Sequence, residues 1–200
     1  MIRRRGVMLG LIAGLGGCAL SERPFAERRQ WPLQVVRPIG VPARRGRPVL
    51  ELRDLLAGPG LEARGLQTLQ ADGSIRVAYY EEWAVPPAQA LEDGLRQWLA
   101  QSGLFAAVTG AGSRLAADLA FDGTLTAFWA DPAHGLASAT IAFTLIDLRP
   151  ATRRVVVQSS QTASVPLLGA DATNVAQALR AAAAAVFRQI EAELRAALPG

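Results

Sequence analysis

The chain has 200 residues, half of them hydrophobic, which fits one domain with a sizeable core. Its 21 basic side chains are all arginine, and three of them fall within the first five residues. Without those three, 18 basic and 17 acidic side chains leave a net charge of +1 instead of +4. This charge gives no reason to expect nucleic-acid binding. One cysteine and one histidine can form neither an intramolecular disulfide nor a His/Cys zinc site.

The first 18 residues predict a targeting signal. The three arginines precede an uncharged, mostly apolar run of about 12 residues, whereas a membrane-spanning helix needs roughly 20. A basic start, a short apolar stretch and small residues before a cleavage point are typical of a secretory signal peptide.

The end of this run, Leu15-Gly16-Gly17-Cys18, resembles the bacterial lipobox, in which the cysteine is acylated and becomes the first residue of the mature protein. We therefore expect residues 1–17 to be a lipoprotein signal peptide and Cys18 to carry a covalent diacylglycerol and acyl lipid. The polar residues 18–30, which include Pro24, then form a lipidated flexible tether. The alternative is an uncleaved or ordinarily cleaved leader with an incidental buried thiol.

The first half of the remaining chain reads as strands followed by a helix. The predicted elements are strands at residues 31–36, 49–53, 66–70 and 75–80, and a helix from Pro87 to a C-terminal cap at Gly103. Asp72-Gly73 lies between the third and fourth strands, and its tolerance of positive φ favours a tight turn and an antiparallel pair. Gly94 lies inside the predicted helix, where it indicates either a close backbone approach or an imperfect helix.

The second half predicts a strand at residues 104–109, a three-stranded antiparallel meander and a long helix. The meander alternates apolar and polar residues over 115–129, 139–145 and 155–165. An apolar stripe over residues 172–198 predicts the second helix, with Asp171 or Thr173 as its N-cap. We therefore expect residues 31–200 to form a single α+β domain, a two-layer sandwich in which a mainly antiparallel sheet packs against two amphipathic helices.

No catalytic residue, cofactor site or metal site can be assembled from the sequence. His134 lies in a turn with only Asp131 nearby, and Glu81 and Glu82 are strand neighbours that point to opposite faces. Phosphate-binding glycine loops and nucleophile elbows are absent from the sequence. The sequence therefore predicts a protein that is not an enzyme, with an unrecognised hydrolase as a remaining alternative.

Two aromatic residues at the end of a predicted strand are candidates for contact with a partner. Tyr80 and Trp83 belong to a Tyr-Tyr-Glu-Glu-Trp segment, and such rings are either core anchors or an exposed recognition patch. Threonines 124, 126, 140 and 144 line the polar face of the predicted sheet, which is either a second binding surface or a solvated face.

The order of these features resembles a family, the ABC-type transport auxiliary lipoproteins. The resemblance rests on Cys18, on Arg47-Pro48-Val49-Leu50-Glu51-Leu52-Arg53, on Tyr80-Glu81-Glu82-Trp83-Ala84 before the first helix, and on Gly103-Leu104-Phe105 after it. The chain departs from the family pattern just before Arg47, and residues 58–64 look inserted.

The resemblance implies a non-catalytic periplasmic lipoprotein that serves as an accessory subunit of an intermembrane phospholipid transport system. Its implied partners are a mammalian-cell-entry-domain protein and the permease and ATPase of an ABC transporter, and a homo-oligomer is left open. Alanine rather than aspartate at position 19 favours the outer membrane. The alternative role is that of an assembly or pilot lipoprotein for another outer-membrane complex.

Overall fold

The structure is a computed structural model that describes residues 27–43 and 46–198. Cys18, the expected signal peptide and most of the expected tether lie outside these residues. The elements are β1 (Arg29–Trp31), β2 (Val49–Ala57), β3 (Gly65–Leu69), β4 (Ile75–Trp83), α1 (Pro87–Ala100), β5 (Ala107–Gly110), β6 (Leu119–Asp131), β7 (Leu136–Asp147), β8 (Arg154–Pro166) and α2 (Ala172–Ala197).

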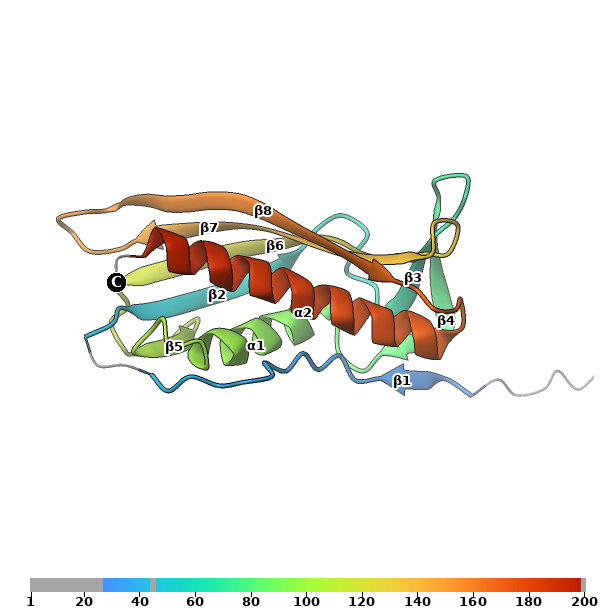
Figure 1. Ribbon diagram of the computed structural model, residues 1–200, viewed down its shortest axis with the longest axis horizontal. Helices are drawn as coiled ribbons and strands as arrows, with labels where there is room; N and C mark the ends of the chain where they lie inside the picture. The colour runs from blue at the N-terminus through green and yellow to red at the C-terminus, as the bar shows by residue number, and fades with distance from the viewer. Residues whose placement is uncertain (1–26, 44–45, 199–200) are drawn as a thin grey trace, which may run out of the picture.

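All eight of these strands join one sheet, which is covered on one side by the helices (Figure 1). The long β6–β7 and β7–β8 ladders are antiparallel, which confirms the predicted meander, and β3 and β4 form the predicted hairpin. β2 pairs in parallel with both β5 and β6, and β1 pairs in parallel with β4, so the sheet is mixed. The predicted α+β sandwich with two helices is confirmed.

Both helices bury one apolar stripe against the same face of the sheet. α1 lies against β2 and β5, and α2 lies against β6, β7 and β8. Among the largest buried side chains, the rings of Trp98 and Phe187 meet edge to face across the two helices, with centroids 5.7 Å apart. Asp171 caps the N-terminus of α2: its Oδ1 accepts from the Asn174 backbone N–H at 3.1 Å, so the first of the two predicted N-caps is the one observed.

Gly94 marks a close approach between the helices. A Cβ atom at this position would lie 3.3 Å from a ring carbon of Phe187 and 3.7 Å from Val35. The glycine therefore makes room for α2 and for the N-terminal segment, which favours the first of the two interpretations drawn from the sequence.

The predicted strand at residues 31–36 is wrong. Strand pairing is confined to β1, which begins at Arg29, inside the expected tether. Residues 32–43, which we call the strap, run instead along α1 and α2 (Figure 1). Pro32, Pro38 and Pro42 have no N–H to donate to a ladder, and Leu33 and Val35 bury their side chains in the helical layer without a neighbouring strand.

The strap is fastened at both ends. At its start, the Trp31 carbonyl accepts from the Ala84 N–H at 2.8 Å, and at its far end the Val41 N–H donates to the Gln101 carbonyl at 2.7 Å. Between them, Arg37 forms a bidentate ion pair with the buried Glu191 of α2. No helix among residues 27–43 and 46–198 is long and apolar enough to cross a membrane.

Candidate functional site

The residues weighed for catalysis form no reaction centre. His134 Nδ1 lies 2.7 Å from Asp131 Oδ2 in an exposed turn, and this hydrogen bond lowers the pKa of the Asp131 carboxyl. In the described part of the chain, no group of three or more His, Cys, Asp or Glu side chains is placed to hold a metal ion. The pair is therefore a turn contact on the surface.

Glu81 and Glu82 have a structural task. Glu81 Oε2 accepts from Trp31 Nε1 at 2.7 Å, whereas Glu82 Oε1 accepts from Gln30 Nε2 at 3.0 Å and from Arg64 Nη2 at 3.2 Å. The two carboxylates bind different donors, as expected for neighbours on one strand. Both fasten β1 to β4, so the short strand is held by side chains as well as by its backbone.

Trp83 is a core residue. It is 1% exposed, and its ring lies 5.7 Å from that of Phe128. Of the two alternatives left by the sequence, the structure therefore selects the core anchor, and Trp83 is removed from the candidate contacts with a partner.

Tyr80 lies on the surface, together with residues that the sequence did not single out for binding. Tyr80 is 48% exposed and Tyr79 is 69% exposed, and their rings meet edge to face at 4.9 Å. The guanidinium of Arg28 lies 4.9 Å from the centre of the Tyr79 ring. Ile75 and Val77 of the same strand are also exposed. We call Ile75, Val77, Tyr79 and Tyr80 the β4 edge patch.

The β4 edge patch lies on a strand edge that no described strand covers. β1 covers only residues 81–83 of β4, while β3 occupies the opposite edge. No strand among the described residues pairs with the outer edge of residues 75–80, in the part of the hairpin that projects from the body (Figure 1). An unpaired edge presents N–H and C=O groups to which another strand can be added. The alternation of Ile75, Val77 and Tyr79 was the available signal in the sequence.

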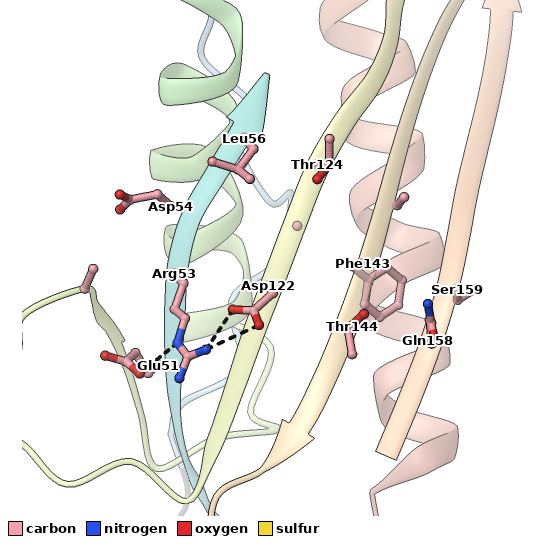
Figure 2. A pocket seen from close by; sticks show the side chains of 13 residues that line it. Glu51, Arg53, Asp54, Leu56, Asp122, Thr124, Phe143, Thr144, Gln158 and Ser159 are labelled. Carbon is pink, nitrogen blue, oxygen red and sulfur yellow. Dashed lines mark hydrogen bonds and ion pairs between the residues drawn. The ribbon is translucent and has the colours of Figure 1, made fainter. Parts of the chain in front are cut away.

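A second surface lies on the helix-free face of the sheet. A hollow of about 630 Å³ lies there, and Arg53 bridges Glu51 and Asp122 across it at 3.2–3.4 Å. Figure 2 shows the side chains that line it. Thr124 and Thr144 line the same hollow. The remaining threonines bond within the sheet, because Thr140 pairs with Thr162 at 3.0 Å and Thr126 donates to the Thr140 carbonyl at 3.4 Å.

The charged side chains of this hollow are partly paired and leave it negative. Arg53 and Asp122 are each more than 40% exposed, and such exposed pairs contribute about 0–1 kcal/mol. Arg53 lies between Glu51 and Asp122 and donates to both, and Asp54 adds a third carboxylate to the lining, so the described lining of the hollow has no free cation to hold an anionic ligand. The hollow is a solvated polar face, and the β4 edge patch is the stronger candidate for a contact site.

Comparison with known proteins identifies the family. The sequence model for the ABC-type transport auxiliary lipoprotein component matches residues 32–191. The chain belongs to this family. The match runs from the strap to Glu191 in the C-terminal part of α2, and the resemblance inferred from the sequence is confirmed.

Solved structures share the fold of this family member. A Xanthomonas campestris protein of the family DUF330 is 20% identical with a TM-score of 0.66, and the match covers 84% of this chain and 95% of that one. A crystal structure described only as an uncharacterized protein has a TM-score of 0.67 at 15% identity, covering 84% and 98% of the two chains. A hypothetical Chlamydia trachomatis protein has a TM-score of 0.52 at 12% identity, covering 76% and 99%. No curated protein sequence matches significantly.

Proposed function

We propose that this ABC transport auxiliary lipoprotein is a non-catalytic accessory subunit of an intermembrane phospholipid transport system. It is anchored in the outer membrane by lipid on Cys18 and faces the periplasm. Its partners are a mammalian-cell-entry-domain protein and the ABC permease and ATPase. Family membership supports the transport role, and the lipobox-like segment supports the anchor.

One observation carries the assignment of the contact site. The β4 edge patch combines four exposed apolar or aromatic side chains on a projecting hairpin with a strand edge that is unpaired within residues 27–43 and 46–198. A partner that adds an extended strand there gains backbone hydrogen bonds from the edge and apolar contacts from the side chains. Tyrosine is also among the residue types that contribute most to binding at interfaces. We therefore assign the patch to the contact with the transporter.

Pull-down from detergent-solubilised membranes tests this contact. The wild-type chain is expected to recover the transporter subunits, whereas the Tyr79→Ser/Tyr80→Ser variant should recover at least about tenfold less, as expected when two anchoring side chains are lost. Leu168→Ser is the matched control, because Leu168 is 89% exposed outside the patch. Recovery of only secretin or barrel-assembly components would replace the proposal with the assembly or pilot role.

Metabolic labelling with palmitate tests the anchor separately. Cys18→Ala is expected to abolish labelling, because Cys18 is the only cysteine of the chain. Two or three acyl chains give a stable anchor, whereas one is marginal. Continued labelling of the variant would refute lipidation at this residue.

A further inference from the structure

A basic hollow lies where the strap crosses the seam between α1 and α2. It has a volume of about 430 Å³ and is lined by Arg37 and Ile39 of the strap, Trp98 of α1, and Arg188, Glu191 and Arg195 of α2. Figure 1 shows the strap along the lower edge of the molecule, below α1. Three segments that are distant in the sequence therefore form one surface.

Glu191 fixes two of the three guanidinium groups of this hollow. Its Oε2 accepts from Arg37 Nε at 3.0 Å and from Trp98 Nε1 at 2.8 Å. Its Oε1 accepts from Arg37 Nη2 at 3.1 Å and from Arg195 Nη2 at 2.8 Å. Four donors occupy this carboxylate, and two of the side chains that supply them are cationic, so its negative charge is neutralised within the cluster.

Arg188 adds a third positive charge. It is exposed, and it forms no ion pair with any residue of the described ranges. The hollow thus carries three guanidinium groups and one neutralised carboxylate, and it is positive overall. Guanidinium donors match phosphate oxygens in pairs, so the chemistry that suits this hollow is that of a phosphate group.

Exposed apolar side chains flank Arg37 in the strap, and one of them, Ile39, also lines the hollow. Val36 is 73% exposed and Ile39 is 76% exposed, while Leu33 and Val35 of the same strap are buried. A soluble phosphate would use the arginines alone. Apolar side chains next to basic ones are typical of protein surfaces that insert shallowly into anionic bilayers.

We propose that the strap surface, formed by Val36, Arg37, Ile39, Arg188 and Arg195, docks onto a bilayer that contains anionic phospholipid. The arginines bind headgroup phosphates, and the two aliphatic side chains enter the boundary between headgroups and acyl chains. The proposal rests on the proposed lipid anchor for proximity. About ten residues separate Cys18 from β1, so the start of β1 stays within roughly 35 Å of the anchored lipid.

Hydrogen exchange in nanodiscs tests the docking. The intact lipoprotein, purified from membranes, is incorporated into nanodiscs of phosphatidylcholine alone or of phosphatidylcholine with phosphatidylglycerol. Backbone amides of the strap are expected to exchange several-fold more slowly in the anionic discs. Arg188→Glu and Ile39→Ser should each reduce this difference, and neither substitution removes a contact on which the fold depends. Arg76→Glu, at an exposed position of β4, is the matched control and should keep the full difference.

Other outcomes overturn the docking or separate it from the proposed function. Equal exchange in the two kinds of disc would refute it. The same slowing after inorganic phosphate is added to phosphatidylcholine discs would show a soluble phosphate site instead. A chain that fails to enter discs refutes the anchor. That chain is then added to preformed discs: the docking proposal requires it to co-migrate with the phosphatidylglycerol discs only. Co-migration with neither kind of disc refutes the docking. Pull-down of transporter subunits with the Arg188→Glu variant tests the accessory role independently of the docking.

Discussion

β7 and β4 carry similar alternating patterns of apolar residues but have opposite environments. In β7, Ile141, Phe143 and Leu145 are at most 3% exposed. In β4, Ile75, Val77 and Tyr79 are 41–69% exposed, and only Trp83, the last residue, is buried. The two strands differ in whether a helix covers them. α2 covers β6, β7 and β8, whereas most of β4 belongs to a hairpin that extends past the helical layer (Figure 1).

This contrast separates two properties that are often inferred together from an alternating strand pattern, namely which side chains share a face and whether that face is buried. Alternation decides which side chains share a face, but a covering element decides whether that face is buried. Where no cover is present within the chain, an apolar face is available to a partner. The following substitutions test how sharply the buried and exposed regions differ.

The largest effect is expected at the boundary between the two regions. Trp83→Ala should lower the free energy of unfolding by about 3–5 kcal/mol, because it empties a core position packed against Phe128. Tyr80→Ala, only three positions earlier, should change it by less than about 1 kcal/mol. Thermal denaturation measures both, with a decrease in Tm of roughly 10 °C expected for the first variant. Equal losses would contradict the assignment of Trp83 to the core and Tyr80 to the surface.

A smaller loss is expected at the seam between the helices and the strap. Glu191→Gln should lower the free energy of unfolding by about 2–4 kcal/mol, because Arg37 and Arg195 lose their shared carboxylate. Denaturant unfolding at pH 7 measures this loss. Glu62→Gln, at an exposed position, is the matched control and should leave stability unchanged within about 0.5 kcal/mol.

The same carboxylate predicts a dependence on pH. Burial raises the pKa of Glu191, but hydrogen bonds from Arg37, Arg195 and Trp98 outweigh burial and place the pKa below its ordinary value. A depressed pKa means that the folded state binds fewer protons than the unfolded state. The contribution of Glu191 to the free energy of unfolding is therefore complete above about pH 5 and is lost as the pH falls. Between pH 7 and pH 3, the free energy of unfolding should therefore change less with pH for Glu191→Gln than for wild type. Identical slopes would count against this linkage.

The smallest effect is expected in the exposed hairpin. Gly73 has a φ of +83°, so Gly73→Ala should cost about 1–2 kcal/mol, and Gly73→Asn should cost less because asparagine tolerates this region. The loss should be confined to the hairpin. Hydrogen exchange is expected to increase in β3 and β4 but not in β7, and a uniform increase would show that the two regions unfold as one unit.

The elements that could be predicted from the sequence are those encoded by neighbouring residues. The β3–β4 hairpin follows from Asp72-Gly73, the meander from period-two alternation, and the start of α2 from the capping side chain of Asp171. The strap was missed because Leu33 and Val35 alternate as strand residues do. Their burial depends on helices that lie far along the chain, and no local pattern reports this.

The candidate sites were predictable only in part, for the same reason. The aromatic segment drew attention to Tyr80, but the lack of cover over Ile75 and Val77 is a property of the whole fold. The cluster at Glu191 joins residues as much as 154 positions apart, so the sequence contains no motif for it. Trp83 could not be assigned before its packing against Phe128 was known.

The course of the strap determines how a mechanical load on the N-terminus would enter the body. Tension would reach β1 first, where three register pairs and the carboxylates of Glu81 and Glu82 resist it. If β1 detached, the load would pass along the strap to the ion pair between Arg37 and Glu191, which is anchored in α2. The sheet that carries the β4 edge patch would therefore stay under tension until β1, its edge strand, had been pulled away.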